Sequence, residues 1–424
     1  MWNFYYDEAF HDRKITVKNN SINVYAENSS DIYTGFFIGF NEVEETEFFE
    51  KYALFEKKYK EFYTIADEEE LKGTTIGKKN YRNGFATFNK NTLNFYNEFF
   101  DILNDGRVIF HIGMFSKTEL IVNEFLRNVI VTCQINRSSF LYSLTKFLYT
   151  YRNQPLLIEM MQCENCSDVR NVIDSLLEFM QNIIDRSFNS KRKHLEKNAL
   201  IELVCVLRTA QIFNFRHSEL GWRYEQVFIG FNKLLNERSI KQTDVNLFID
   251  TEANTLKAAK AVSEYNKCDE LRESKGLRIS DILSHFFGSL ALSLESAFRE
   301  VEIHDEGDLD KIDYAKKNLI PKEWFNISEN QFLLYHKIMK IFNNFHAYEW
   351  TGYDSNFGDS PVIVFCLLRY FLNYDIFEKF SETPNEMHCE YFNTSCCEML
   401  KFKFARGGSE PAEKNYFEKI GLGL

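Results

Sequence analysis

The stretch FYYDEAF at residues 4–10 decides the fold that the sequence predicts. Its aromatic residues favour an extended strand, and the acidic pair Asp7 and Glu8 stands where that strand would end. Because successive side chains of a strand point to opposite faces, only one carboxylate of the pair can enter a given site. We assign that position to Asp7 and keep Glu8 as a weaker candidate.

The segments that follow continue the pattern of strands first and helices afterwards. Short β-branched or aromatic runs are separated by Asn, Ser and Asp clusters, so we expect an antiparallel meander. Aromatic residues at three- and four-residue spacing predict amphipathic helices. The predicted strands lie at 14–17, 22–25, 33–40 and 107–115, and the predicted helices at 44–62 and 89–104.

The remaining sequence predicts two long helical regions with a short α/β segment between them. The α/β segment contains a strand at 245–250, a helix at 254–265, an extended piece near 269–273 and a helix at 277–293. We therefore expect an α/β protein with a mixed sheet, flanking helices, a large all-helical insertion and a helical C-terminal region. The expected boundaries are 1–116 for the first part of the core, 117–243 for the insertion, 244–300 for the second part of the core and 301–424 for the C-terminal region.

Composition restricts the class of protein. Only 5 Pro and 18 Gly in 424 residues favour long helices over a many-turned all-β fold. The nine Cys have no disulfide-like spacing, and no apolar run reaches membrane-spanning length, so we expect a cytoplasmic protein without a membrane span. The net charge of -12 argues against a general nucleic-acid coat. It is compatible with a nuclease, whose metal-binding carboxylates add to the negative charge.

Three acidic residues fall where strands or helices would present them to one site. Asp7 and Asp250 each end a predicted strand, and Asp281 lies on the following amphipathic helix, one turn before His285. Carboxylate oxygens are the ligands that hard cations such as Mg²⁺ and Mn²⁺ prefer. The sequence therefore predicts a site for such ions, with His285 and Glu252 as weaker candidates.

At this point the sequence resembles a known family. FYYDEAF followed by YTGFFIGF at 33–40 is similar to the first strands of the bacterial domain of unknown function numbered 3800, which has a ribonuclease-H-like fold. Further similar segments occur in the same order: EELKGTTIG at 69–77, NLFID at 246–250 and ESKGLRISDILSHFFG at 273–288. The chain departs from the family pattern at Arg278 and Ser280, where Gln and Ala are usual.

The resemblance implies functions for particular residues of this chain. Asp7, Asp250 and Asp281 would bind metal, Glu70 would be a further carboxylate, and Lys72 would contact phosphate. The expected activity is hydrolysis of RNA or DNA by a two-metal carboxylate site, in bacterial anti-phage defence. The basic segment KKNYR at 78–82 would help to position the nucleic acid through Lys78, Lys79 and Arg82.

Two alternatives remain open at this stage. The chain could be a non-catalytic ribonuclease-H-like scaffold whose helical regions bind a protein or nucleic-acid partner. A structural zinc site would require convergence of Cys and His residues, since zinc takes four nitrogen or sulfur ligands. The candidates for it are Cys163, Cys166, His388, Cys389, Cys396 and Cys397. The sequence contains no Walker loop, nucleophile elbow, zinc-protease motif or dinucleotide fingerprint.

Overall fold

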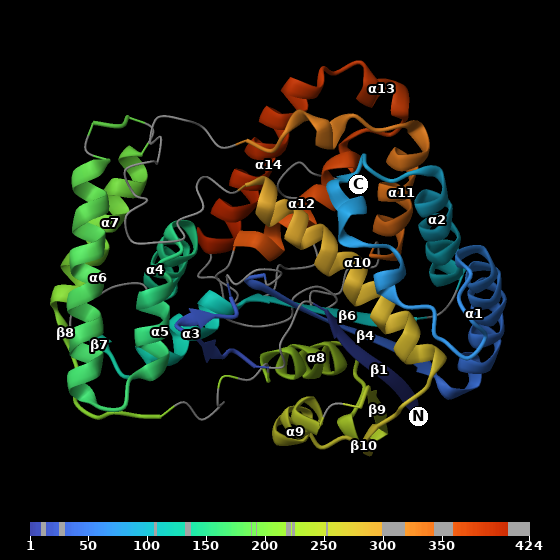
Figure 1. The fold of residues 1–424 in the computed structure, drawn as a ribbon, viewed down its shortest axis with the longest axis horizontal. Coiled ribbons are helices and arrows are strands. Elements are labelled where there is room, and N and C mark those ends of the chain that lie inside the picture. The colour runs from blue at the N-terminus through green and yellow to red at the C-terminus, as the bar shows by residue number, and fades with distance from the viewer. Residues whose placement is uncertain are drawn as a thin grey trace.

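A five-stranded mixed sheet lies at the centre of the computed structural model (Figure 1). The strand order is β10-β9-β1-β4-β6; β1 pairs antiparallel with β4 and parallel with β9, β4 pairs antiparallel with β6, and β9 pairs parallel with β10. The strands are β1 (Trp2–Ala9), β4 (Ile32–Asn41), β6 (Ile109–Ser116), β9 (Val245–Ile249) and β10 (Lys267–Glu270). The structure describes residues 1–9, 14–24, 30–105, 108–131, 137–187, 189–191, 193–217, 222, 225–251, 253–298, 319–342 and 359–405.

Helices cover both faces of this sheet. One face carries α1 (Glu42–Tyr63), α2 (Lys90–Asp105), α10 (Lys275–Ala297), α11 (Glu329–Ile341), α12 (Asp359–Tyr370) and α14 (Asn385–Ala405), with the short α13 (Phe377–Ser381) beside them. The other face carries α3 (Lys117–Leu126), α8 (Gln226–Glu237) and α9 (Ala253–Val262). Beyond these, α4 (Arg137–Tyr151), α5 (Gln154–Gln162), α6 (Cys166–Arg186) and α7 (His194–Arg208) extend to one side (Figure 1).

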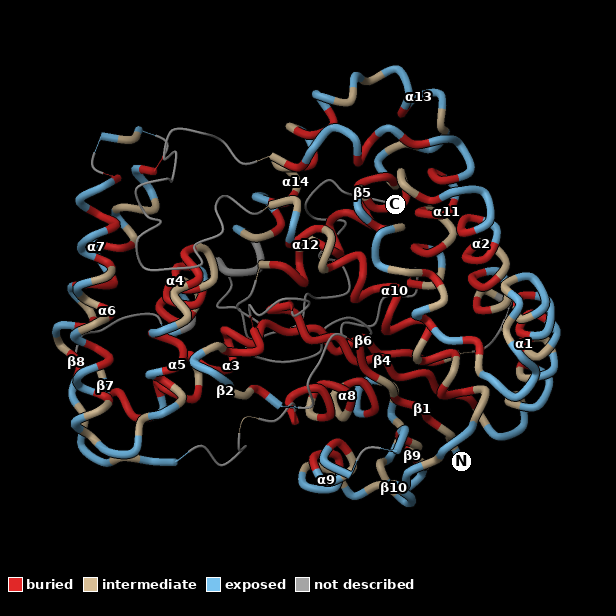
Figure 2. Tube along the Cα trace, in the orientation of Figure 1, coloured by how far each residue is buried: buried red, intermediate tan, exposed pale blue. Residues whose placement is uncertain are grey.

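Two hydrophobic clusters fill the space between the sheet and its helices. Phe4 and Tyr6 of β1 belong to the cluster under α3, α8 and α9, whereas Tyr5 belongs to the cluster under α10. This alternation is the two-residue period of a strand that is covered on both faces. The central strands are accordingly buried along most of their length (Figure 2), so functional side chains can reach solvent only at the ends of the strands.

Several sequence predictions are confirmed by this architecture. The protein is α/β, with a mixed sheet and flanking helices. The helices predicted over 44–62, 89–104, 254–265 and 277–293 correspond to α1, α2, α9 and α10. Within the insertion, new helices begin after Asn153 and Asn165, whose side chains accept hydrogen bonds from the first N–H groups of α5 and α6.

The predicted antiparallel meander is wrong in its middle part. The runs at 14–17 and 22–25 form only the two-residue strands β2 (Val17–Lys18) and β3 (Ser21–Ile22), which pair with each other and not with the central sheet. A tight turn with positive φ at Asn19 and Asn20 closes this hairpin. The Asn23 side chain also bonds the N–H of Thr16 and the carbonyl of Lys14. These backbone groups are therefore occupied, and β4 pairs directly with β1.

The insertion at 117–243 is also not entirely helical. The two-residue strands β7 (Ile130–Val131) and β8 (Ala210–Gln211) pair antiparallel and join the segment after α3 to the segment after α7. The pairing connects residues about eighty positions apart, so local periodicity could not predict it. In the C-terminal region, residues 299–318, 343–358 and 406–424 lie outside the described residues.

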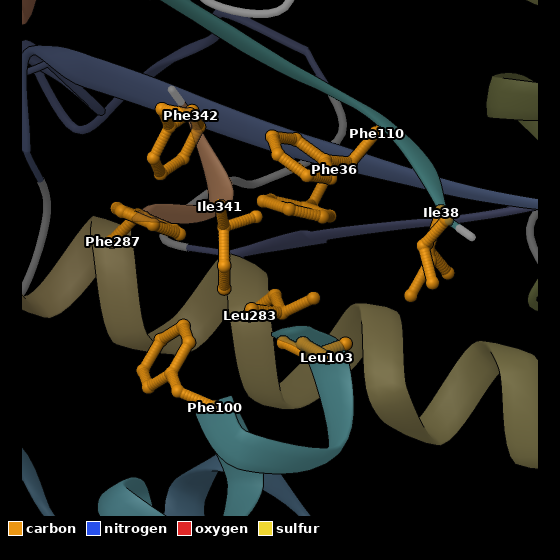
Figure 3. A pocket seen from close by; sticks show the side chains of 10 residues that line it. Phe36, Ile38, Phe100, Leu103, Phe110, Leu283, Phe287, Ile341 and Phe342 are labelled. Atoms are coloured by element: carbon orange, nitrogen blue, oxygen red, sulfur yellow. The ribbon is translucent and has the colours of Figure 1, made fainter. Parts of the chain in front are cut away.

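A small pocket lies between α10 and the sheet (Figure 3). Apolar side chains line it, among them Phe36, Phe110 and Leu283, and its volume is about 10 Å³. This volume holds no more than a single water molecule, and the lining offers no polar partner. The pocket is therefore a packing gap and not a ligand site. No helix in the described part of the chain is long and apolar enough to cross a membrane.

Candidate metal centre

Asp7 lies near the carboxyl end of β1, and Asp250 directly follows the end of the neighbouring strand β9. The parallel ladder of β1 and β9 pairs Tyr5 with Phe248, and their rings stack with centroids 5.3 Å apart. Asp7 stands two residues further along β1, and Asp250 is the first residue after β9, two positions beyond Phe248, so a continued strand alternation would turn both carboxylates to the same face. The parallel pairing of β1 with β9 thus brings together two acidic residues that are far apart in the sequence.

The helix α10 brings the third acidic residue to this edge. It packs closely along β1, since a Cβ added to Gly276 would lie 2.3 Å from ring atoms of Tyr5. One turn later, Oγ of Ser280 donates a 2.6 Å hydrogen bond to the backbone carbonyl of Phe36, which pairs with Asp7 in the antiparallel ladder. The residue after Ser280 is Asp281. The register of α10 on the sheet therefore presents Asp281 to Asp7.

The carboxylates repel one another at this edge. Burial raises the pKa of Asp7 well above its ordinary value, and the negative charges of Asp281, Glu8 and Asp250 raise it further. A 2.8 Å hydrogen bond from the backbone N–H of Glu8 opposes this shift only in part. The site thus favours a proton or a cation at Asp7.

Asp281 is also buried among acidic residues, but two neighbouring groups lower its pKa and so oppose the effect of burial. Burial raises its pKa, and the charges of Glu70 and Asp250 act in the same direction. The backbone N–H of Gly73 donates a 2.7 Å hydrogen bond to Oδ2 of Asp281 and, together with the charge of Lys72, lowers the pKa. The segment around Gly73 therefore orients the Asp281 carboxylate.

This segment is held against α10 by an ion-pair cluster that the sequence analysis did not find. Nε of Arg278 lies 2.6 Å from Oε1 of Glu56 on α1, and Nη1 lies 3.7 Å from Oε1 of Glu70. Glu70 therefore contacts Arg278 and influences Asp281 only through its charge. The only feature of the sequence that pointed to this cluster was Arg278 itself, which stands where Gln is usual in the family pattern.

Glu8 points away from this site, as the pleat predicts. On the opposite face of the sheet its carboxylate accepts hydrogen bonds from the hydroxyl of Tyr33 at 3.1 Å and from Oγ1 of Thr255 at 3.0 Å. Glu8 is only 8% exposed. The other weaker acidic candidate, Glu252, lies outside the described residues.

The predicted basic residues lie on both sides of Gly73: Lys72 directly precedes it, and Lys78, Lys79 and Arg82 follow it. Lys72 is exposed near Asp281, and the charge of Lys78 acts on His285. Lys79 and Arg82 are exposed in the short 3-10 helix η2 (Lys78–Tyr81) and at the start of β5 (Arg82–Phe85). Lys72 therefore adjoins the carboxylates, and Lys78 lies near His285 on the same segment.

His285 is buried one turn after Asp281 on α10. Burial lowers its pKa to about 4, and the nearby charge of Lys78 acts in the same direction. The imidazole is therefore neutral at neutral pH. It lies against the same segment as Asp281, since a Cβ on Gly73 would be 2.5 Å from Cβ of His285.

The zinc alternative has no support from the described residues. Both ring nitrogens of His388 are engaged, Nδ1 with the hydroxyl of Tyr370 at 2.7 Å and Nε2 with the carbonyl of Phe380 at 3.1 Å. His388 is thus a hydrogen-bonded core residue. Across the residues that the structure describes, no three His, Cys, Asp or Glu side chains are grouped as they would be around a bound ion. Asp7, Asp250 and Asp281 do not form such a group either: they lie on adjoining elements, but their side chains are not close enough to share an ion.

Comparison with known proteins gives no relative: no protein-family model, no curated protein and no solved structure matches this chain. The interpretation of the site depends on its geometry. The ladder between β1 and β9 ends at Tyr6 and Ile249, directly before Asp7 and Asp250, and the packing of α10 adds Asp281.

Proposed function

We propose that this protein is a metal-dependent nuclease with a ribonuclease-H-like core, in which Asp7, Asp250 and Asp281 bind Mg²⁺ or Mn²⁺. One observation carries the proposal: the packing of α10 on β1 presents Asp281 to Asp7, with Asp250 at the end of the neighbouring β9. Burial and the charges of these carboxylates raise the pKa of Asp7 in agreement with this geometry. Such a cluster of charges is costly unless it binds protons or a cation. The mixed sheet with helices on both faces agrees with the fold that the family resemblance implies.

The donor set fits a hard divalent cation. The three residues offer only carboxylate oxygens, which suit Mg²⁺ and Mn²⁺ better than zinc. Without an ion, the like charges of the carboxylates repel one another. A cation bound between them would offset this repulsion and allow the carboxylates to approach. Asp250 has room for this movement because it is exposed, and Oδ1 accepts a 2.6 Å hydrogen bond from the neighbouring N–H of Thr251.

Different residues of this chain would have different roles in hydrolysis. When bound, the ions would supply an activated water and offset charge on the scissile phosphate. Lys72, next to Asp281, would contact a phosphate, and Lys78, Lys79 and Arg82 would hold the strand further along the same segment. Gly73 would keep Asp281 in its orientation through the hydrogen bond to Oδ2.

The test is manganese-dependent cleavage of single-stranded, double-stranded and hybrid RNA and DNA substrates. We expect Asp7→Asn and Asp281→Asn to reduce cleavage by at least about 100-fold, because loss of a ligand exceeds the usual effect of changing its outer-shell partners. Asp244→Asn is the matched control, since Asp244 is exposed just before the opposite end of β9. Unchanged cleavage in both site variants would overturn the proposal.

A non-catalytic scaffold is the alternative, and one contact favours it. Glu70, expected as a further carboxylate of the site, faces Arg278 at 3.7 Å. If the folded wild-type protein neither binds Mn²⁺ nor cleaves any substrate, the scaffold is the better explanation, with a protein or nucleic-acid partner on its helical regions. A role in bacterial anti-phage defence is proposed from the resemblance alone.

A further inference from the structure

A buried hydrogen-bond chain lies beneath the carboxylates, on the opposite face of the sheet. Its centre is Glu8, which accepts from Tyr33 on β4 and from Thr255 on α9. The hydroxyl of Tyr33 also contacts that of Tyr6. All four side chains are less than 10% exposed. Glu8 thus connects three elements of the fold: β1, β4 and α9.

The connection to α9 bears directly on Asp250. Asp250 occupies the short turn between β9 and α9, and Thr255 lies in the first turn of that helix. On one side the turn is fixed by the sheet, where the N–H of Leu271 donates a 2.9 Å hydrogen bond to the carbonyl of Ile249. On the other side the Thr255–Glu8 hydrogen bond fixes the helix against β1. The backbone of Asp250 is therefore held at both ends.

We propose that Glu8 is a positioning residue that fixes the turn carrying Asp250 and so aligns Asp250 with Asp7. This inference rests on the proposed metal centre, and it gives the acidic pair two separate roles. Asp7 would bind the ion, whereas Glu8 would hold the second ligand, Asp250, in position from the opposite face of the sheet. Loss of a residue that hydrogen-bonds a metal ligand directly typically weakens metal affinity 10- to 100-fold. Glu8 acts on Asp250 through Thr255 and the backbone, so we expect an effect at the lower end of this range.

The experiment measures two properties of each variant: Mn²⁺ affinity by calorimetry and amide hydrogen exchange of the peptide that spans residues 248–257. Thr255→Val removes the hydroxyl but keeps the shape of the side chain, and Thr255→Ser restores a hydroxyl. Lys257→Ala is the control, because Lys257 is exposed on the same helix. We expect Thr255→Val to weaken Mn²⁺ binding about tenfold and to accelerate exchange. The Thr255→Ser and Lys257→Ala proteins should resemble the wild type.

A second variant, Glu8→Gln, distinguishes a positioning role of Glu8 from direct binding of the metal. It also provides the test if the Thr255→Val protein does not fold. Its amide oxygen can still accept from Thr255, so a positioning role predicts a loss of Mn²⁺ affinity below about tenfold. A fall of 100-fold or more would make Glu8 a ligand and overturn the inference. So would unchanged exchange, or unchanged Mn²⁺ affinity, in Thr255→Val. If the wild type binds no Mn²⁺, the proposed function fails, while the exchange measurement still decides whether Glu8 holds the turn.

Discussion

The backbone N–H of Gly73 donates a 2.7 Å hydrogen bond to Oδ2 of Asp281, a residue 208 positions later in the chain. The bond depends on close packing, because Gly73 has no Cβ that would separate the segment from α10. An added Cβ would lie 2.7 Å from the carbonyl oxygen of Asp281 and 2.5 Å from Cβ of His285. Gly73 thus contributes in two ways. Its lack of a Cβ allows the segment to pack against α10, and its N–H donates the hydrogen bond to Asp281.

Gly73→Ala should therefore disturb the site more than the fold. We expect the segment to move away from α10, with a loss of about 1–3 kcal/mol in the free energy of unfolding and weaker Mn²⁺ binding. Gly77→Ala is a matched control four residues later, because a Cβ there meets no atom within 4 Å. Urea unfolding and Mn²⁺ titration of both variants provide the check. Equal behaviour of the two alanine variants would contradict the role of Gly73.

Removal of the Asp7 charge should change how stability depends on pH. The pKa of Asp7 is raised in the folded state, so the folded protein binds its proton more tightly than the unfolded chain does. In metal-free buffer the wild type should lose stability as pH rises from the ordinary value of 3.8 through the raised pKa. The Asp7→Asn protein should lose less stability, so the difference between its free energy of unfolding and that of the wild type should grow with pH. Urea unfolding with a chelator, from pH 5 to 8, measures this difference.

Addition of Mn²⁺ provides the complementary observation for the same variant. A ligand that binds only the folded state raises the melting temperature. We expect Mn²⁺ to stabilise the wild type and to have little effect on Asp7→Asn. Equal stabilisation of both proteins would show that the ion binds elsewhere.

Arg278→Met should release the segment that bears Gly73. The substitution leaves Glu56, which is 9% exposed, without its 2.6 Å ion pair. Loss of one partner of a well-buried ion pair lowers the free energy of unfolding by roughly 3–5 kcal/mol. Because the pair of Arg278 with Glu56 is partly exposed, we expect a decrease of about 2 kcal/mol. Lys58→Met, which breaks the exposed pair with Glu98, should cost less than about 1 kcal/mol. Chemical unfolding of the two variants compares these costs, and a larger effect at Lys58 would contradict the assignment.

The basic residues after Gly73 predict a specific dependence on salt. If Lys79 and Arg82 each contact one phosphate, Lys79→Ala combined with Arg82→Ala should weaken binding of all nucleic-acid sequences alike. The slope of log affinity against log salt concentration should become shallower by about 1–2. Fluorescence anisotropy between 50 and 200 mM salt measures this slope, with exposed Lys90→Ala as the control. An unchanged slope would remove these residues from the nucleic-acid path.

Much of the fold followed from local patterns in the sequence. The two-residue period of FYYDEAF predicted that Asp7 and Glu8 face opposite sides, and the strand-end positions predicted where Asp7 and Asp250 lie. The amphipathic spacing of 277–293 predicted the helix that carries Asp281. These features depend on neighbours within a few residues, and a single sequence contains that information.

The contacts that orient the site could not be predicted in the same way. The bond from Gly73 to Asp281 and the pair of Arg278 with Glu56 join segments more than 200 residues apart. The hairpin at 17–22 was also missed, because the Asn23 side chain bonds backbone groups that a sheet would otherwise use. Glu8 was placed on the correct face, but its partner Thr255 lies 247 residues away. Tertiary packing determines each of these contacts.

His285 should affect the pH dependence of stability with the opposite sign to Asp7. Burial lowers its pKa from 6.5 to about 4 in the folded state, so between these values the unfolded chain binds the proton and the folded protein does not. The wild type should therefore lose stability as pH falls from 6.5 to 4, by roughly 3 kcal/mol from this residue. His285→Asn should show a flatter profile in metal-free buffer. Parallel profiles of the two proteins would contradict a neutral, desolvated His285 beside Lys78 and would leave its ring available to take up a proton at the site.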